Sequence, residues 1–351
     1  MSKKIALVHD WLLGLGGAER VLHELHEVFP EAPVYTLFAS KRFVRQFLPN
    51  TKVFTSFLQK FPFITRNYRF WAALMPLAVE SFDLSEYDVV ISSSVLFSKG
   101  LIVRPKTKHI CYCYSPARPL WDRSSEYAKG LVSRHLWRIW DRQASDRVDE
   151  FVSISKTIQE RIKKYYGKDS RIIYPPNTLE VQAAEASLER EPYYLIVARL
   201  FPHKNIELAI DVFNKLGQRL IVIGDGPLRE KLQELAGPTV RILGPKDDET
   251  VATYYKYCRA LIMPQEEDFG LTSVEAMMYG KPVLALRKGG AVESIIEGET
   301  GEFFDDPIPQ ALADGVRRLN ERYDGYDKQG IIEQAKKFSR EKFRSEILSL
   351  L

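Results

Sequence analysis

The sequence contains few cysteines and no long hydrophobic run. Only three of its 351 residues are cysteines: Cys111 and Cys113 are two positions apart, and Cys258 is distant. This spacing supports neither a disulfide framework nor a metal-ligand set, so we predict reduced thiols in a cytosolic protein. No stretch reaches the length of a transmembrane helix, and the apolar run Ile5–Val8 is too short for a signal peptide.

Acidic residues are missing from one long segment, residues 32–79. The net charge of +4 is too small to indicate a nucleic-acid partner. The acid-free segment nevertheless carries seven basic residues, Lys41, Arg42, Arg45, Lys52, Lys60, Arg66 and Arg69. Its aromatic residues include Phe57, Phe61, Phe63, Tyr68, Phe70 and Trp71. This mixture indicates either a surface for an anionic membrane or acidic ligand, or core aromatics beneath a solvated basic face.

Apolar runs alternate with helical patterns in both halves of the chain, which predicts α/β structure with parallel sheets. The expected strands are 5–8, 89–91, 110–112 and 151–154, then 194–197, 220–223, 240–243, 261–263 and 283–286. The clearest expected helices are 131–148, 155–166, 205–216 and 227–235. A chain of this length favours two domains, and Pro175-Pro176 stops regular structure between them.

These boundaries predict a first Rossmann-like domain at 1–174, a linker at 175–192 and a second Rossmann-like domain at 193–330. Residues 331–351 form a helix that we expect to pack back toward the first domain. Two doubly wound sheets of this kind bind ligands at the carboxyl ends of their strands, so we expect the domains to face each other across a cleft.

The richest motif surrounds two carboxylates, Glu267 and Glu275, which flank a Phe-Gly turn. It reads as strand, loop, helix and strand. A polar loop that opens a helix after a strand is a common anion-binding place. Taken alone, Thr272-Ser273-Val274-Glu275 also fits a capping box with Thr272 as the N-cap, which is a purely structural interpretation.

Further loops follow other predicted strands. Gly14–Arg20 opens the first helix and is either a phosphate-approaching loop or a tight turn. Arg199 and Lys204, five residues apart, are either a clamp for a diphosphate or solvated cations. Gly224-Asp225-Gly226-Pro227 is either a nucleotide-side loop or a turn with proline at the helix start. Neither a dinucleotide fingerprint nor a P-loop occurs.

The string Glu-x-Phe-Gly-x-x-x-x-Glu-Ala-Met, followed by Gly-Lys-Pro-Val, resembles the donor-site signature of retaining family 4 glycosyltransferases, which have the GT-B fold. The resemblance implies that Glu267 contacts sugar hydroxyls and that Glu275 holds the ribose. It implies further donor contacts from the Phe269-Gly270 turn, Leu271 and Thr272, from Gly16 and Gly17, from Gly224 and Gly226, and from Lys246. Arg199 and Lys204 would neutralise the leaving nucleoside diphosphate.

One position departs from this pattern. Mannosyltransferase-like members carry a His that faces the donor sugar where this chain has Tyr114, within His109–Arg118. A Tyr hydroxyl can bond a sugar or phosphate oxygen but does not accept a proton at neutral pH. For the nearby His109 we expect a packing role. Asp10 and Arg118 are the acceptor-side candidates.

The resemblance implies an enzyme that moves a hexose from a nucleotide sugar, with GDP-mannose as the preferred donor. Residues 75–84 resemble members that build surface polysaccharides, which implies a lipid-linked saccharide acceptor. We expect no cofactor and no metal, front-face transfer rather than a Glu267 nucleophile, and peripheral binding to the cytoplasmic face of an anionic membrane. The alternatives are a catalytically impaired GT-B scaffold protein and a Rossmann-type epimerase or dehydrogenase.

Overall fold

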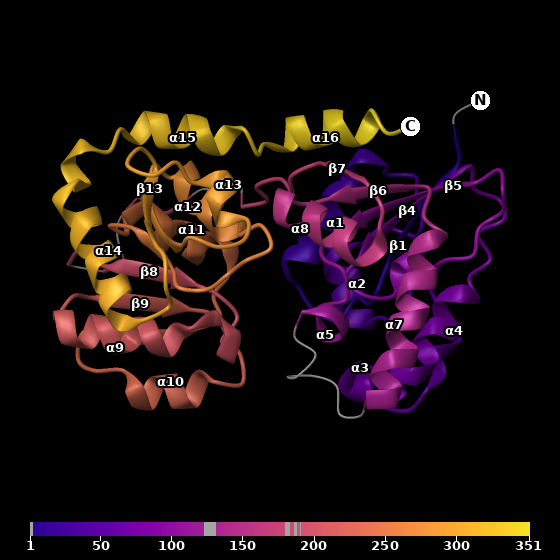
Figure 1. Ribbon diagram of the computed structural model, residues 1–351, viewed down its shortest axis with the longest axis horizontal. Helices are drawn as coiled ribbons and strands as arrows, with labels where there is room; N and C mark the ends of the chain where they lie inside the picture. Colours follow the sequence, from indigo (N-terminus) through magenta and orange to yellow (C-terminus); the bar gives the residue numbers. More distant parts are fainter. Residues whose placement is uncertain (1–2, 123–130, 180–182, 186–187, 190) are drawn as a thin grey trace. The chain divides into compact units, whose positions relative to one another are not determined.

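The computed structural model describes residues 3–122, 131–179, 183–185, 188–189 and 191–351 (Figure 1). The chain forms two compact units. Unit 1 comprises Met1–Pro175 together with Arg340–Leu351, and unit 2 comprises Pro176–Ser339. The predicted α/β class is confirmed, because each unit is built on one parallel sheet with helical crossovers.

Unit 1 contains a seven-stranded sheet with the order β3-β2-β1-β4-β5-β6-β7. Its strands are β1 (Ile5–His9), β2 (Val34–Thr36), β3 (Val53–Thr55), β4 (Val89–Ser94), β5 (Lys108–Cys113), β6 (Glu150–Ser153) and β7 (Ser170–Ile172). All six pairings are parallel, and Leu7 of β1 lies opposite both Val34 and Ile91. The central strands β1, β4 and β5 are almost wholly buried, which explains why they read as continuous apolar runs.

Helices connect these strands in unit 1. The α-helices are α1 (Gly17–Val28), α2 (Lys41–Phe47), α3 (Ile64–Asn67), α4 (Met75–Glu80), α5 (Arg118–Trp121), α7 (Leu131–Asp146), α8 (Lys156–Tyr166) and α16 (Arg340–Leu348). Short 3₁₀ turns are η1 (Phe57–Lys60), η2 (Tyr68–Leu74) and η3 (Ser98–Gly100). The acid-free segment therefore contains β2, α2 and β3, followed by the short helical elements η1, α3 and η2, which join β3 to α4.

Unit 2 contains a six-stranded parallel sheet with the order β10-β9-β8-β11-β12-β13. Its strands are β8 (Tyr194–Val197), β9 (Leu220–Ile223), β10 (Val240–Gly244), β11 (Leu261–Met263), β12 (Val283–Leu286) and β13 (Gly301–Phe304). The helical elements are η4 (Pro202–Lys204), α9 (Ile206–Leu216), α10 (Arg229–Leu235), α11 (Asp248–Tyr257), α12 (Leu271–Met278), α13 (Ala291–Ser294), α14 (Pro309–Glu321), η5 (Tyr323–Gly325) and α15 (Lys328–Lys336).

One helix start differs from the sequence prediction. Pro227 was expected in the first turn of a helix, but α10 begins at Arg229 with Leu228 as its N-cap. Pro227 lies in the turn before it, where Leu228 N donates to Leu200 O at 3.1 Å and ties this turn to the preceding loop.

The chain crosses from unit 1 to unit 2 at Pro175 and returns at Arg340. Described parts of the segment 175–192 pack on unit 2: Ala184 N donates to Thr253 Oγ1 at 2.9 Å, and Glu189 pairs with Arg219 at 3.0 Å. At the other end, α16 packs on α1 within unit 1, where Arg340 pairs with Glu24 at 3.1 Å.

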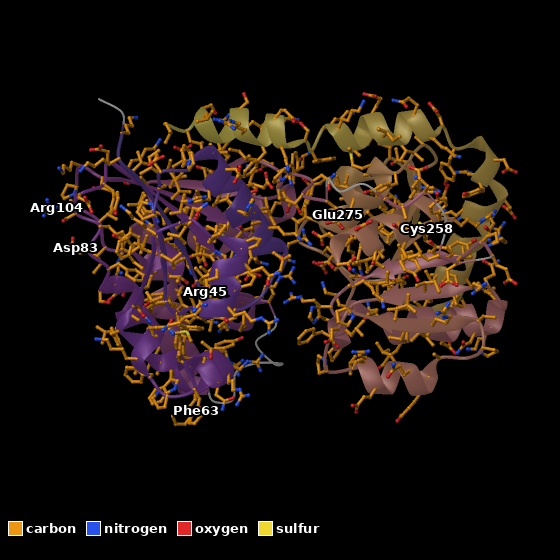
Figure 2. All side chains as sticks on the ribbon, turned by 180° about the vertical axis from the view of Figure 1, so that it is seen from behind. Arg45, Phe63, Asp83, Arg104, Cys258 and Glu275 are labelled. Atoms are coloured by element: carbon orange, nitrogen blue, oxygen red, sulfur yellow. The ribbon has the colours of Figure 1, made fainter. Side chains whose placement is uncertain are left out.

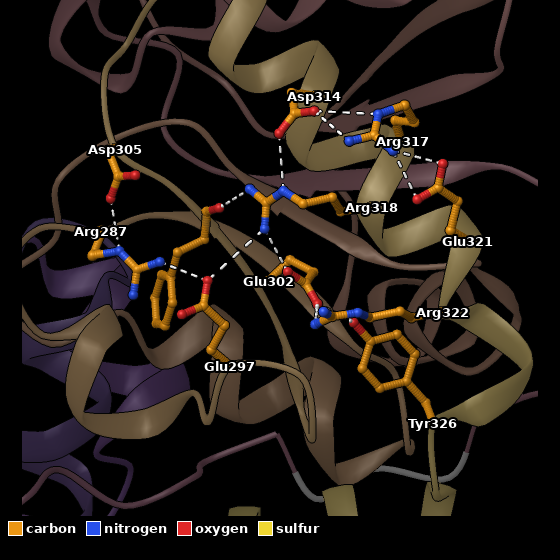
Figure 3. Close-up of polar contacts among 11 residues, drawn as sticks. Arg287, Glu297, Glu302, Asp305, Asp314, Arg317, Arg318, Glu321, Arg322 and Tyr326 are labelled. Atoms are coloured by element: carbon orange, nitrogen blue, oxygen red, sulfur yellow. Dashed lines mark hydrogen bonds and ion pairs between the residues drawn. The ribbon is translucent and has the colours of Figure 1, made fainter.

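Unit 2 carries a charge network along β13 and α14 (Figure 3). Glu302, which is buried on β13, pairs with Arg318 at 2.6 Å and with Arg322 at 2.8 Å. Arg317, on the exposed side of α14, pairs with Asp314 and Glu321. The buried carboxylate is thus fully compensated, whereas the outer pairs lie in solvent and contribute little.

Unit 1 contains a more deeply buried ion pair, between Lys99 of η3 and Asp141 of α7, at 2.5 Å. Both side chains are almost completely buried. Asp141 also accepts hydrogen bonds from Trp121 Nε1 and Tyr166 Oη, each at 2.8 Å. The carboxylate therefore joins η3, α5, α7 and α8.

In the described part of the chain, no helix is long and apolar enough to cross a bilayer.

We predict that Lys99→Met lowers the free energy of unfolding by about 3–5 kcal/mol, because it leaves the Asp141 charge buried without its cation. Lys99→Met combined with Asp141→Asn should recover much of that loss. Urea unfolding of the two variants measures the difference. Arg317→Ala, which breaks only exposed pairs, is the control and should leave the unfolding midpoint unchanged. A double variant no more stable than Lys99→Met would contradict the prediction.

Candidate functional site

The strand order of unit 2 reverses direction between β8 and β11, and this reversal positions the main predicted residues. From β8 the chain builds outward to β9 and β10, then returns to β11 on the other side. Loops after such neighbouring strands diverge and leave a crevice at the carboxyl ends. Lys204 ends η4 in the loop after β8, and Glu267 lies in the loop after β11. Sequence-distant residues therefore meet at this edge of the sheet.

Lys204 and Glu267 form an ion pair, with Nζ 2.5 Å from Oε1. Lys204 is only 7% exposed, and Asn205 Nδ2 anchors its loop by donating to Pro264 O at 3.0 Å. Gln265 Nε2 donates to the same Oε1 of Glu267 at 2.9 Å. We did not predict a role for Gln265. Its position two residues before the predicted glutamate was the only signal in the sequence.

Arg199 lies at the start of the same loop, but its side chain is exposed. Its guanidinium carbon lies 5.6 Å from the centre of the Phe201 ring. Among the described residues, no carboxylate lies within ion-pair distance of Arg199. The structure thus brings Lys204 and Glu267 together. Arg199 is an exposed cation in the same loop as Lys204, and no carboxylate of the described residues pairs with it.

The loop after β9 requires glycine. Gly224 has φ +143°, and a Cβ there would lie 1.8 Å from Ala198 O. At Gly226 a Cβ would lie 2.5 Å from Leu200 O. Both glycines therefore allow this loop to pack directly against the backbone that follows β8. Lys246 is exposed and lies between β10 and α11.

The alternative interpretation of Thr272 as the N-cap of a capping box is wrong. Helix α12 begins at Leu271, and its N-cap is Gly270, which has φ +92° and supplies no side chain. Thr272 is the second helical residue. This end of the helix follows directly after the loop that carries Glu267. Phe269, in contrast, is buried, and its ring meets Phe338 edge-on at 5.3 Å.

Glu275 is held by a residue that no sequence pattern indicated. It lies on α12 in unit 2 (Figure 2) and is 8% exposed. One of its oxygens accepts a hydrogen bond from Tyr255 Oη of α11 at 2.9 Å. The rings of Tyr255 and Tyr279 stack nearly parallel, 6.2 Å apart. The carboxylate is therefore oriented by tertiary packing and not by a helix cap.

Unit 1 also reverses its strand order, between β1 and β4. Asp10 follows β1 and is fully buried. Its two oxygens accept hydrogen bonds from the backbone N–H groups of residues 95–98, at 2.5–2.9 Å. Four such bonds fix the loop between β4 and η3 and satisfy both oxygens of the buried side chain.

The glycine-rich loop and Tyr114 lie together in unit 1. Gly16 is the N-cap of α1, and Gly17 is its first residue. Tyr114 Oη donates to Ala18 O at 3.0 Å and lies 2.9 Å from Ser93 Oγ. Burial raises the pKa of Tyr114 well above its usual value. Tyr114 is therefore a neutral hydroxyl that ties the loop to β4.

His9 extends this cluster and was not predicted. Its Nδ1 lies 3.0 Å from Ser93 Oγ, and its Nε2 lies 3.7 Å from Glu19 Oε1. Glu19 in turn folds back toward Gly16, where a Cβ would lie 2.7 Å from Glu19 Oε2. An imidazole is thus present near Tyr114, although on β1 and not in the predicted family position.

Arg118 begins α5, close along the chain to Trp121, which bonds the buried Asp141. His109 lies on β5 with Nε2 2.8 Å from Ser92 Oγ, and burial lowers the pKa of His109 to about 4. The packing role expected for His109 agrees with this burial.

All three cysteines are buried and unpaired. No group of three or more His, Cys, Asp or Glu side chains in the described residues is arranged to hold a metal.

Comparisons with known proteins match nearly the whole chain. The model of the Glycosyltransferase Family 4 matches residues 15–181, and that of Glycosyl transferases group 1 matches residues 178–338. The alpha-1,3/1,6-mannosyltransferase ALG2 of Candida glabrata is 27% identical over 362 residues, which cover 84% of this chain and 78% of that protein.

A GDP-mannose-dependent alpha-mannosyltransferase of Mycolicibacterium smegmatis is 29% identical over 207 residues, 56% of this chain and 55% of that enzyme. Some curated relatives are thus matched over only about half of their length. The structure of Anabaena HepE in complex with UDP and glucose has a TM-score of 0.73, with 18% identity and 99% of both chains covered. The two units therefore have the GT-B fold, as predicted.

The buried imidazole of His109 predicts a loss of stability in mild acid. The unfolded chain binds a proton at this His near pH 6.5, whereas the folded chain does so only near pH 4. Stability is therefore present above the unfolded pKa and falls as pH drops toward the folded pKa. Between pH 7 and 5 the loss should be about 2 kcal/mol.

Urea unfolding at the two pH values tests this effect. His109→Gln should reduce the pH dependence by that amount, and the same change at the exposed His135 is the control. An unchanged pH dependence in His109→Gln would show that another group causes the acid sensitivity.

Proposed function

This chain belongs to the group 1 and family 4 glycosyltransferases, which are nucleotide-sugar-dependent enzymes, and we propose that it transfers mannose from GDP-mannose to a lipid-linked saccharide with retention of configuration. The observation that carries the proposal is the Lys204–Glu267 pair at the strand-order reversal of unit 2. Mannose is favoured by two relatives, ALG2 and the mycobacterial GDP-mannose-dependent enzyme.

The proposed chemistry is electrostatic. As the bond between the sugar C1 and the diphosphate oxygen breaks, the electron pair stays on the diphosphate, and its negative charge grows. Lys204, Arg199 and the N–H groups at the start of α12 stabilise that charge where it develops. We propose that these groups, rather than a metal ion, neutralise the diphosphate. Gly224 and Gly226 let the nucleotide approach the backbone after β9, and Lys246 lies at its base side.

Glu267 contacts the hydroxyls of the transferred sugar in this proposal, and Glu275 contacts the ribose. Oε1 of Glu267 is held by Lys204 and Gln265, and both donors lower the nucleophilicity of the carboxylate. This arrangement favours front-face attack by the acceptor hydroxyl, which passes its proton to the leaving diphosphate. A covalent intermediate on Glu267 is the less favoured route.

In this proposal unit 1 is the acceptor-side domain, with Asp10 and Arg118 on the acceptor side. The loop at Gly16 and Gly17 contacts the donor, together with Tyr114, which bonds Ala18 O just after that loop. Arg118 supplies a cation on α5. Asp10 acts on this side through the loop that it fixes, because its oxygens bond four backbone N–H groups.

Tyr114 in place of the family His motivates a second candidate function, a GT-B protein that binds the donor but transfers slowly.

We further propose that unit 1 binds the anionic inner face of a membrane through the acid-free segment 32–79. All seven of its basic side chains are exposed, and none pairs with a described carboxylate. Phe57, Phe61, Tyr68 and Trp71 pack partly against the core. Phe63 and Phe70, however, are 71% and 80% exposed, and Phe63 lies at the edge of unit 1 (Figure 2). Both explanations of the aromatics therefore apply, each to different residues.

A groove of about 690 Å³ supports this location, because its lining includes Phe63, Arg66, Arg69 and Phe70. Arginine side chains beside exposed rings suit the headgroup region, where the charges meet phosphates and the rings enter the boundary with the acyl chains. A lipid-linked acceptor would then be presented to unit 1 at the same surface.

The main experiment measures GDP release from GDP-mannose by the purified full chain, with water as the acceptor, together with GDP binding by calorimetry. Glu267→Ala should lower the rate by about 100-fold, the size of effect seen when one group that stabilises a transition state is removed. GDP affinity should change little. Glu266→Ala, which removes the neighbouring carboxylate, is the control. Wild-type turnover by folded Glu267→Ala would remove Glu267 from the site.

Vesicle co-sedimentation tests the membrane proposal. Wild-type protein should sediment with anionic vesicles and not with neutral ones, and salt should weaken binding because the charge term is screened. Arg66→Gln with Arg69→Gln should weaken binding about 30-fold, since each cation contributes about 1 kcal/mol near such a surface.

The matched control is Lys328→Gln with Lys337→Gln, which removes the same charge from exposed positions in unit 2. Equal binding to neutral and anionic vesicles, or equal effects of the two double variants, would contradict a specific surface on unit 1.

A further inference from the structure

We propose that Gln265 is a positioning residue that keeps Glu267 in its working orientation while Lys204 engages the leaving diphosphate. The inference rests on the proposed function, in which Glu267 contacts the donor sugar. It concerns a side chain that no motif assigned, near the start of the loop between β11 and α12.

Gln265 is built into the protein interior. Its side chain is 1% exposed, and its Nε2 donates to Glu267 Oε1 at 2.9 Å. The carboxylate of Glu267 determines which end of the Gln265 amide faces it. If the amide were reversed, its carbonyl oxygen would face the carboxylate, and the two negative oxygens would repel. Gln265 therefore presents a donor to Glu267 in one fixed geometry.

The backbone on both sides of Glu267 is also fixed. Asn205 Nδ2 donates to Pro264 O at 3.0 Å, and Gly290 N donates to Glu267 O at 2.8 Å. At Gly289 a Cβ would lie 2.1 Å from Glu267 O, so the two loops are in direct backbone contact. With the main chain held, the orientation of the carboxylate depends on its side-chain partners, and both Gln265 and Lys204 donate to Oε1.

These two donors respond differently to a nucleotide sugar. Lys204 carries a positive charge on a flexible stem, so the diphosphate competes with Glu267 for its ammonium group. Gln265 is neutral and lies next to the carboxylate in the chain, so the diphosphate attracts it far less. When Lys204 turns to the phosphate, Gln265 becomes the donor that still holds Oε1. The Glu267 side chain is only 22% exposed, so once it loses its cation it depends more strongly on neutral donors such as Gln265.

This difference sets an expected pattern of kinetics. The Gln265 bond gains importance as the diphosphate charge develops, so its loss should lower kcat more than it lowers nucleotide affinity. A merely structural glutamine would instead lower stability, or weaken nucleotide binding, without a selective effect on kcat.

The first experiment uses Gln265→Met, which keeps the length of the side chain and removes the donor. GDP release from GDP-mannose should show kcat reduced by about 10- to 100-fold, the range expected for a hydrogen bond to a charged group. The Kd for GDP, measured by calorimetry, should stay within about threefold of wild type, because the donor that is removed is neutral and bonds Glu267. Unchanged kcat, or a parallel loss of GDP affinity, would overturn the inference.

The second experiment uses Gln265→Glu, whose effect depends on pH. While the introduced carboxyl group is protonated, its O–H can donate to Glu267 in place of the amide. Burial and the neighbouring carboxylate raise the pKa of such a group, so the donor is present at low pH and is lost as pH rises through that raised pKa. The ratio of variant to wild-type kcat should therefore fall as pH increases from about 5 to 8, a window set by the ordinary Glu pKa of about 4.3 and its upward shift.

Gln334→Glu is the matched control. Gln334 is also a buried amide of unit 2, but its Nε2 donates to Ser294 O at 3.1 Å. This variant should show a kcat ratio that does not vary with pH. If Gln265→Met fails to fold, the pH profile of Gln265→Glu still decides, and a flat ratio would overturn the inference.

Failure of this inference is distinct from failure of the proposed function. An inactive Glu267→Ala with a fully active Gln265→Met would remove the positioning role alone. A fully active Glu267→Ala would remove the role of Glu267 itself, whatever the Gln265 variants show.

Discussion

The ion pair between Lys204 and Glu267 is the interaction on which the candidate site depends. Its partners are 63 positions apart in the chain and meet because β8 and β11 are neighbours where the strand order of unit 2 reverses. The pair joins the two functions that sugar transfer requires, a cation for the diphosphate and a carboxylate for the sugar hydroxyls. Donor binding must redistribute these contacts, since the diphosphate and Glu267 are both anions that attract the same ammonium group.

The two units use a carboxylate at their strand-order reversals in different ways. In unit 1, Asp10 bonds four backbone N–H groups, so its oxygens hold the loop after β4 in place. In unit 2, side chains hold Glu267 through Oε1, and side chains can exchange partners more easily than a backbone can. The same topology therefore gives a structural carboxylate in one unit and, in our account, a working one in the other.

The sequence predicted the class of the fold and nearly all of the central strands, because buried parallel strands such as β4 and β9 are continuous apolar runs. The strands β2, β3, β7 and β13 were not predicted. The first three have only three residues each and no continuous apolar run, and in β13 the apolar run is shortened by Gly301 and Glu302. Glu267 and Lys204 were identified as site candidates from motif spacing. The partners Gln265 and Tyr255 were not identified, because their contacts come from tertiary packing. The capping-box interpretation of Thr272 was wrong because Gly270, with positive φ, is the N-cap and the helix begins two residues earlier.

A structure of the full chain with intact GDP-mannose bound tests the central claim most directly. The account predicts that Lys204 Nζ lies within hydrogen-bond distance of a diphosphate oxygen and that Glu267 bonds a hydroxyl of the mannose. Gln265 Nε2 should remain on Glu267 Oε1. A complex in which the diphosphate lies away from Lys204, with the Lys204–Glu267 pair unchanged and Glu267 out of contact with the sugar, would contradict it.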